Sequence, residues 1–272
     1  MAPVLAIAQQ VPPTPATAAA FFDIDNTVVR GASAFHLGTA LVRRGVIRAK
    51  DLRAFAWRHL CYLLRGEKKA DVVSIQEDAL RLVRGLSVAD IMAVGEQVYD
   101  EVLAHRIYEG TQQLLRRHVT AGDEVWLVTA SPQQMAALMA RRLGATGAVG
   151  TVAESADGVF TGRLVGGLMH GAAKARAVEQ LAAARGLDLA ECSAYGDSQN
   201  DIPLLEAVGR PCGINPDRKL RRHCARAGWP LREFRGSRRV MRRSLTMAYR
   251  AGAVWAAFVA LRGAKRRLTG RR

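Results

Sequence analysis

The residues from 110 to 233 alternate between short apolar segments and longer segments with helical spacing. The apolar segments have the length of strands, and most of the helical segments reach ten residues or more. The expected strands are EVWLVTA, AVGTVAE, CSAYG and PCGIN, and the expected helices are GTQQLLRRHVTAG, PQQMAALMARRLG, residues 172–185, IPLLEAVG and PDRKLRRHCARAG. This alternation predicts an α/β fold with a doubly wound, parallel, Rossmann-like sheet.

A first apolar run, residues 18–24, precedes a region of different character. Residues 34–105 contain few strand-forming residues and show helical spacing in four stretches, FHLGTALVRRG, LRAFAWRHLCYLLRG, VSIQEDALRLVRG and VADIMAVGEQVYDEVLAHR. Each stretch ends near a glycine or a basic residue, as helices often do. We therefore expect a first strand followed by a helical insert. Residues 158–166 (GVFTGRLVG) are expected to form a hairpin.

The two ends of the chain differ from the region between them. The N-terminus has no basic residue before its short hydrophobic stretch and is then interrupted by three prolines, which argues against a secretory signal and predicts a loose arm over residues 1–17. Residues 234–272 hold twelve Arg or Lys and no acidic residue, which leaves +4 of the formal charge of +16 for residues 1–233. The basic character therefore belongs to a C-terminal tail.

Within this tail, residues 244–261 are apolar apart from Ser244, Thr246 and Arg250. A membrane span needs about 20 mostly apolar residues, so this stretch is marginal. One interpretation is an interfacial helix through which residues 236–272 contact anionic lipid. The other is an Ala-rich helix docked on the body of the protein. The tail contains no nucleic-acid recognition motif, so no nucleic-acid partner is expected.

The four cysteines are scattered through the chain without a CxxC pair. This spacing argues against a cysteine zinc site and favours a reducing compartment. We therefore expect a cytoplasmic protein. The basic tail suggests a second possibility, a peripheral position at the inner face of the membrane.

Asp23 and Asp25 close the first expected strand. Residues two apart at the end of a strand project to the same side, and open α/β sheets bind ligands at this edge. One carboxylate could attack phosphorus to form an acyl phosphate, while the second protonates the leaving oxygen and later deprotonates water. The alternative is an ordinary turn in which Thr27 begins a helix.

A second acidic cluster, GDSQND at residues 196–201, follows the expected strand CSAY. Asp197 and Asp201 could complete an oxygen-rich magnesium site with Asp23, and Asn200 could orient phosphate or water. A solvated helix cap is the alternative.

Two further positions could bind phosphate. Thr129 ends the strand EVWLVTA, and its hydroxyl and the amides of Ala130 and Ser131 in the turn behind it could hold phosphate oxygens at a helix N-terminus. Lys174 lies near the beginning of a helix, where the helix dipole disfavours a cation, so a phosphate partner would account for it. Ordinary capping and a solvated surface lysine are the alternatives.

Taken together, these four motifs resemble those of the haloacid dehalogenase superfamily in order and spacing, and residues 18–233 are similar to its phosphoserine-phosphatase-like subfamily. The resemblance implies an α/β core formed by residues 18–30 and 109–233. It also implies that residues 31–108 form a helical cap that covers the site and selects the substrate.

The same resemblance implies the roles of the carboxylates. Asp23 is implied to be the nucleophile and Asp25 the general acid/base. Magnesium is implied as the cofactor, held by the carboxylates of Asp23 and Asp197 and by the main-chain carbonyl of Asp25, with Asp201 supporting the site. Thr129, Ala130, Lys174 and Asn200 are implied to bind the phosphate of the substrate.

The implied function is a magnesium-dependent phosphomonoester hydrolase that acts through an aspartyl-phosphate on a small or lipid-linked phosphate ester. Asp25 favours this reaction, because transport ATPases of the superfamily have Thr at that position and dehalogenases lack the second acid. Phosphoserine phosphatase is an alternative, although Ala32 stands where those enzymes have a Glu for the substrate amine. A catalytically silent phosphate-binding regulatory module is another alternative, which the intact acidic motifs disfavour.

Overall fold

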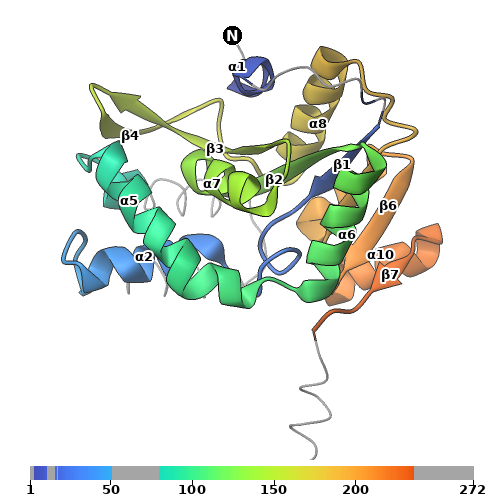
Figure 1. The fold of residues 1–272 in the computed structure, drawn as a ribbon, viewed down its shortest axis with the longest axis horizontal. Helices are drawn as coiled ribbons and strands as arrows, with labels where there is room; N and C mark the ends of the chain where they lie inside the picture. The colour runs from blue at the N-terminus through green and yellow to red at the C-terminus, as the bar shows by residue number, and fades with distance from the viewer. Residues whose placement is uncertain (1–2, 11–15, 17, 51–79, 236–272) are drawn as a thin grey trace, which may run out of the picture. The chain divides into compact units, whose positions relative to one another are not determined.

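The strands of the described residues form one seven-stranded sheet in the order β4-β3-β2-β1-β5-β6-β7 (Figure 1). The computed structural model describes residues 3–10, 16, 18–50 and 80–235. The strands are β1 (Ala19–Phe22), β2 (Glu124–Pro132), β3 (Gly147–Ala156), β4 (Val159–Val165), β5 (Ser193–Gly196), β6 (Arg210–Ile214) and β7 (Leu231–Arg232). All neighbouring strands pair in parallel except β3 and β4.

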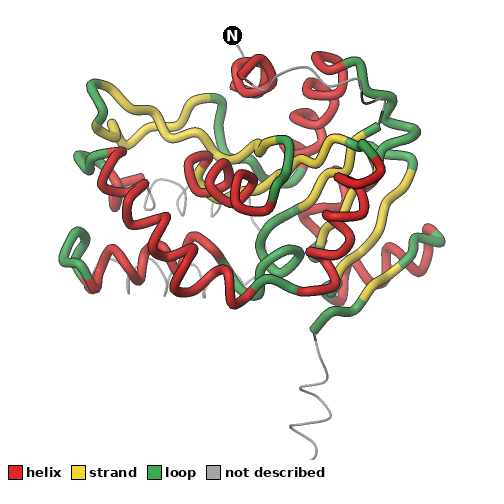
Figure 2. Tube along the Cα trace, in the orientation of Figure 1, coloured by secondary structure: helices red, strands yellow, loops and turns green. Residues whose placement is uncertain are grey.

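Helices cover both faces of this sheet (Figure 2). One core contains buried side chains of α2 (Ser33–Arg43), α5 (Val88–Val98), α6 (Glu109–Ala121) and α7 (Gln133–Leu143). The opposite core contains those of α1 (Pro3–Gln10), α8 (Ala172–Arg185), α9 (Ile202–Glu206) and α10 (Arg218–Ala227). Phe21 and Phe22 of β1 enter one core each, because successive residues of a strand face opposite sides. This arrangement confirms the predicted doubly wound α/β fold.

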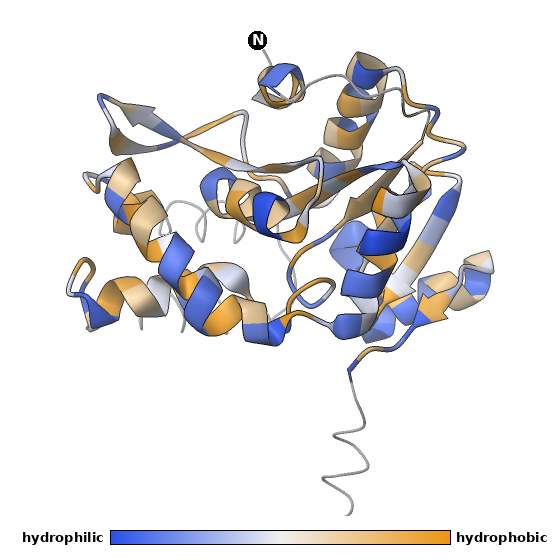
Figure 3. Ribbon diagram, viewed as in Figure 1, coloured by the Kyte–Doolittle hydropathy of each residue, from blue (hydrophilic) through white to orange (hydrophobic). Residues whose placement is uncertain are grey.

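The amphipathic helices turn their polar residues outward, and Figure 3 shows hydrophilic residues on the outer side of α6. Four helices, α6, α7, α8 and α10, end at a glycine in the left-handed conformation. At the end of α6, Gly122 has φ of 86° and its amide donates to carbonyls of the last turn. Glycine adopts this conformation without strain because it has no β-carbon, which explains why the expected helices end where glycines stand.

The described part of the expected insert is helical. α2 and α5 pack against each other, and α5 continues through a π-helical turn, η1 (Tyr99–Leu103), and a 3₁₀ turn, η2 (Ala104–Arg106). The Ser87 side chain caps α5 by accepting a hydrogen bond from the Asp90 amide at 3.3 Å. The stretch LRAFAWRHLCYLLRG and the first half of VSIQEDALRLVRG lie outside the described residues.

The N-terminal segment differs from the loose arm expected over residues 1–17, because residues 3–10 form α1. Val4 and Ala8 lie one helical turn apart, so they form an apolar stripe that is buried in the same core as α8. The Arg185 guanidinium also donates to the carbonyl of Ala8. The proline-rich segment at residues 11–15 lies outside the described residues.

The hairpin expected within residues 158–166 is also different in the structure. Those residues form the single strand β4, which pairs antiparallel with β3 across a two-residue turn. Asp157 and Gly158 have φ of 50° and 77°, the left-handed values that such tight turns need. The hairpin therefore includes the preceding strand, which is longer than the apolar pattern indicates. The two-residue strand β7 was not expected at all.

None of the helices in the described part of the chain combines the length and apolar character needed to cross a bilayer. The tail of residues 236–272, to which the predicted membrane contact belongs, lies outside the described residues.

Candidate active site

The sequence motifs meet at the carboxyl edge of the central strands. β1 is paired with β2 on one side and with β5 on the other, and all three run in parallel. Asp23 therefore follows β1 between Thr129 of β2 and Asp197, which follows β5. The Asp23 amide donates to the Tyr195 carbonyl at 2.9 Å, which continues the pairing of β1 with β5 up to the carboxylate.

Lys174 joins two of the predicted carboxylates. Its ammonium nitrogen lies 2.6 Å from an oxygen of Asp23 and 2.6 Å from an oxygen of Asp201, and all three side chains are buried. Burial by itself would lower the pKa of Lys174, but the Asp201 and Asp23 carboxylates raise it above its ordinary value. Lys174 is thus a buried cation held in place by two anions, rather than a solvated surface residue.

Asp201 is fixed by hydrogen bonds from the segment that follows β5. Its second carboxylate oxygen accepts from the amides of Asp197 and Ser198 at 3.1 Å each, and from the Ser198 hydroxyl at 3.2 Å. A β-carbon at Gly196 would come within 2.5 Å of the Asp201 side chain. A glycine is therefore required at this position for Asp201 to turn back against the strand end.

Asp23, Asp197 and Asp201 could together hold a metal ion. One carboxylate oxygen from each lies within 4.8 Å of the other two, and all three side chains are buried. A donor set made only of oxygens suits Mg²⁺. Because Asp201 already accepts from Lys174 and from two amides, it is better placed to support the site than to contact the ion. Asp23 and Asp197 would then be the direct carboxylate donors to such an ion.

The electrostatics of Asp23 agree with a cation site. Its pKa is raised from 3.8 to about 7. Burial causes most of the rise, Lys174 opposes it, and the nearby carboxylates of Asp201 and Asp25 add to it. A divalent cation at this position would offset the repulsion among the carboxylates and favour ionised Asp23.

Asp25 is held by two serines from different parts of the chain. One carboxylate oxygen accepts from the Ser33 amide at 2.9 Å, and the other lies 3.5 Å from the Ser131 hydroxyl. The hydroxyls of Ser33 and Ser131 lie 2.8 Å apart, and both side chains are buried. Burial raises the pKa of Asp25, and these hydrogen bonds oppose the rise. Ser33 is the first residue of α2, so Asp25 connects the core to the insert.

The remaining predicted residues have different surroundings. The Thr129 hydroxyl accepts from the Ser131 amide at 3.1 Å, which links this buried threonine to the serines around Asp25. The carbonyl of Ala130 accepts from the Thr151 hydroxyl at 2.8 Å. The turn expected directly after Thr129 is absent, since β2 continues to Pro132 before α7 begins.

Asn200 is half-buried in the short turn η3 (Gln199–Asp201), and its side chain makes no hydrogen bond within the described part of the chain. It therefore lies beside the Asp23–Lys174–Asp201 network without joining it.

Two features of the site were not identified from sequence. Ser33 was not assigned a role, because nothing in an insert helix indicates which core residue its first amide meets. Asn215, which is buried after β6, donates from its side-chain nitrogen to the Asn26 carbonyl at 3.1 Å. Asn26 has φ of 61°, and its side chain accepts from the Gly31 amide at 3.1 Å. Asn215 and Asn26 thus hold the loop that follows Asp25.

Comparison with known proteins places these features in a family. The model of haloacid dehalogenase-like hydrolases matches residues 20–206. Phosphoserine phosphatase SerB1 of Mycobacterium tuberculosis (strain ATCC 25618 / H37Rv) is 47% identical over 251 residues, which cover 92% of this chain and 82% of that protein. Histidinol-phosphatase of Neisseria meningitidis serogroup C (strain 8013) is 26% identical, over 79% of this chain and 98% of that protein.

Among solved structures, a protein of unknown function from Bordetella pertussis Tohama I superimposes with a TM-score of 0.72 at 30% identity. The match covers 80% of this chain and 99% of that one. The family model spans more than half of the present chain, including Asp23, Thr129, Lys174, Asp197 and Asp201. The chain belongs to the haloacid dehalogenase-like hydrolases.

Proposed function

We propose that the protein is a magnesium-dependent phosphatase that hydrolyses small phosphate monoesters through an aspartyl-phosphate on Asp23. The observation that carries the proposal is the environment of this one carboxylate. Asp23 lies at the centre of the sheet edge, paired with buried Lys174 and close to two further carboxylates. This is a suitable place for a nucleophile that must attack an anionic phosphoryl group.

The nucleophile must be ionised to attack, and its pKa of about 7 without a metal works against ionisation at neutral pH. Asp23 and Asp197, with the main-chain carbonyl of Asp25, would hold Mg²⁺. The ion would supply positive charge that favours carboxylate Asp23 and offsets the charge of the phosphoryl oxygens. Lys174 adds a second fixed cation, and Thr129, Ala130 and Asn200 complete the proposed phosphate contacts.

Asp25 is the proposed general acid/base. Its raised pKa favours a protonated carboxyl that can donate to the leaving oxygen, and the resulting carboxylate can then accept a proton from water. Ser33 and Ser131 fix the orientation of the Asp25 side chain while these transfers take place. The direction of its pKa shift and its support by two serines are the observations that favour Asp25 for this role.

We assign residues 18–30 and 109–233 to the core and 31–108 to the cap, which would exclude water and select the leaving group. Free phosphoserine is the second candidate substrate, favoured by the name of the 47% identical relative. Ala32 disfavours it, because its methyl group cannot bind an ammonium ion. Lipid-linked esters remain a proposal that depends on the tail.

Hydrolysis of 4-nitrophenyl phosphate by the purified protein, with Mg²⁺ and with EDTA, tests the enzyme against a silent binding module. We expect turnover that needs Mg²⁺ and that is lost in Asp23→Asn, since an amide cannot form the acyl phosphate. Near-normal turnover by Asp23→Asn would rule out Asp23 as the nucleophile. A panel containing phosphoserine, histidinol phosphate and other small esters then identifies the substrate.

A further inference from the structure

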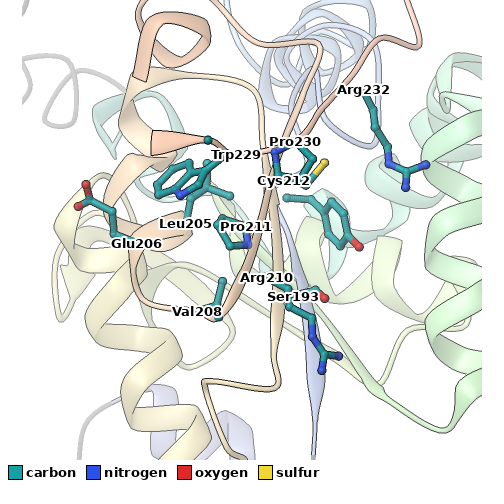
Figure 4. A pocket seen from close by; sticks show the side chains of 13 residues that line it. Ser193, Leu205, Glu206, Val208, Arg210, Pro211, Cys212, Trp229, Pro230 and Arg232 are labelled. Carbon is teal, nitrogen blue, oxygen red and sulfur yellow. The ribbon is translucent and has the colours of Figure 1, made fainter. Parts of the chain in front are cut away.

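A cavity lies along β6, and none of its lining residues belongs to the Asp23 cluster. Its volume is about 660 Å³, which is within the range of small-molecule sites. Residues of β5, β6 and β7 line it, together with the last residues of α9 and the segments that follow α9 and α10. Figure 4 shows Pro211, Leu205 and Val208 on one side of the β6 ribbon and Arg232 on the other.

The cavity exists because β7 covers only the end of β6. The amides of Gly213 and Asn215 donate to the carbonyls of Pro230 and Arg232 at 3.0 and 2.8 Å. The residue of β6 two positions before Gly213, whose backbone faces the same edge, is Pro211. Proline has no N–H to donate. An added peptide strand could not continue the hydrogen-bonding ladder there, so the open edge is suited to a small ligand.

One side of the cavity is polar and rigid. The register of the sheet places Ser193 and Tyr195 of β5 beside Arg210 and Cys212 of β6. The Tyr195 hydroxyl lies 2.8 Å from one ring nitrogen of His118, whose other ring nitrogen lies 2.7 Å from Asp123. Ser193 and Tyr195 are more than nine-tenths buried, so they form a fixed polar floor.

The polar side of the cavity has a net charge of about +1, which comes from Arg232. Arg210 forms an ion pair with Glu191. The Arg232 guanidinium interacts with Cys212 and makes no ion pair with any residue in the described ranges. Burial raises the pKa of the Cys212 thiol, so this thiol stays neutral and does not cancel the charge of Arg232. A guanidinium without an acidic partner can bind the two oxygens of a carboxylate through two parallel hydrogen bonds.

The other side of the cavity is largely apolar. Leu205, Val208, Pro211 and Trp229 line it, and its one acid, Glu206, lies near His223 at 3.3 Å. An indole and a proline ring offer flat contact surfaces to an aromatic or aliphatic body. A second negative charge on the ligand would meet Glu206 rather than another free cation.

We propose that this cavity is a second ligand site that binds a small monocarboxylate with an apolar body. The carboxylate contacts Arg232 and the Ser193 hydroxyl, and the body lies along Pro211 towards Trp229. A monoanion fits better than a phosphate ester, because Arg232 is the single cation on this side that no described acid neutralises. The site is separate from the carboxylate cluster that is proposed to bind phosphate.

Calorimetric titration with sodium benzoate tests the proposal, with saturating orthophosphate and Mg²⁺ present to occupy the Asp23 site. We expect one benzoate per chain with a dissociation constant of about 1 mM or below. Arg232→Gln should weaken binding at least about tenfold, and Ser193→Ala should weaken it by a smaller factor. Benzyl alcohol, which has the same ring without the carboxylate, should give no saturable binding.

Arg222→Gln is the matched control, because it removes one exposed arginine from α10 outside the cavity. It should bind benzoate as the wild type does. The backbone carbonyl of Arg232 makes its hydrogen bond in any variant, so Arg232→Gln should keep the wild-type unfolding temperature and hydrolytic rate. The proposal would be overturned by absence of saturable binding, by binding seen only when orthophosphate is left out, or by wild-type affinity in both Arg232→Gln and Ser193→Ala.

Discussion

The Lys174 ammonium group is the common partner of two buried carboxylates at this site. It supplies the positive charge that lets the buried carboxylates of Asp23 and Asp201 lie close together. Removing one partner of a buried ion pair leaves the other charge without compensation, which typically costs about 3–5 kcal/mol. Here two carboxylates would lose their common partner.

We therefore predict that Lys174→Met lowers the unfolding free energy of the metal-free protein by about 3 kcal/mol or more, and that it abolishes hydrolysis. Urea unfolding in EDTA measures the first effect. Lys219→Met is the control, since Lys219 is exposed on α10 and its loss should change stability by about 0.5 kcal/mol or less. If both variants were equally stable, the ion pairs of Lys174 would not be stabilising the folded state.

Ser33 allows a separate test of general acid catalysis. Ser33→Ala keeps the backbone amide that binds Asp25 but removes the hydroxyl that orients Ser131. Poor leaving groups need a well-placed acid, whereas 4-nitrophenolate leaves without one. We expect kcat for an alkyl phosphate to fall by about 10- to 100-fold while kcat for 4-nitrophenyl phosphate falls by no more than about threefold.

Thr39→Ala is the control for Ser33→Ala, because it removes a hydroxyl from the same helix whose one hydrogen bond among the described residues is to the Phe35 carbonyl. Its kcat values should stay near wild type for both substrates. Equal losses on both substrates in Ser33→Ala would indicate a general structural defect and would contradict the positioning role.

At the scale of the elements, α1 is the segment whose behaviour departs most from the sequence pattern. Its eight residues bury Val4 and Ala8 in the core formed by α8, α9 and α10. A helix this short is marginal in isolation, so its stability comes from docking on the body.

We predict that Val4→Asp detaches α1 and lowers the unfolding free energy by about 2–4 kcal/mol, since it places a charge in an apolar core. Gln9→Asp, at an exposed position of the same helix, is the control and should change stability little. Limited proteolysis reports the detachment, because a free N-terminal segment is cleaved earlier. If Val4→Asp and Gln9→Asp resisted proteolysis equally, burial of Val4 would not be what docks α1 on the body.

The strands and helices that follow residue 110 were predictable because each has a strong local signal. β2 and β5 are apolar runs, and α6, α7 and α8 end at glycines where the sequence pattern ends. Local patterns do not encode pairing between strands, which is why the partner of β4 was assigned incorrectly. β7 has two exposed residues and thus no apolar signal; only its pairing with β6 makes it a strand.

The candidate site was predictable to a similar extent. Asp23, Asp25 and Asp197 follow apolar runs, and the parallel sheet then brings Asp23 and Asp197 to one edge. Lys174 was assigned to the site from its unfavourable position near a helix N-terminus, but its contacts with Asp23 and Asp201 depend on tertiary structure. Ser33 had no sequence signal, since its amide meets Asp25 only after the insert folds back onto the core.

For the molecule as a whole, we expect the cluster of carboxylates to make the unfolding free energy depend on pH and on magnesium. Asp23 has a pKa of about 7 when folded and 3.8 as its ordinary value, so the folded state binds this proton more tightly. Stability should therefore fall as the pH rises from about 4 to about 7 and level off above that range. Asp25, whose pKa is also raised, changes stability in the same direction.

We predict that the metal-free wild type loses stability across this pH range relative to Asp23→Asn, and that Mg²⁺ restores it near neutral pH. At a hundred times the dissociation constant, an ion that binds only the folded state adds about 2.7 kcal/mol. Urea unfolding in EDTA and in Mg²⁺, at several pH values, measures both effects. If the difference in unfolding free energy between wild type and Asp23→Asn did not change with pH, this would contradict the raised pKa of Asp23.

The position of β1 has a consequence for the order in which the chain can fold during its synthesis. Of the described strands in this sheet, β1 is the first to be synthesised, yet it lies in the middle, and Ala19 pairs with Glu124 while Ala20 pairs with Ser193. At about 5–20 residues per second, the apolar segment AAFF waits roughly 5–20 s for its first partner strand and longer for its second. The strand that leads to Asp23 is thus synthesised early and completed late. During this interval the apolar strand lacks the neighbours that cover it in the folded protein, which leaves it open to aggregation.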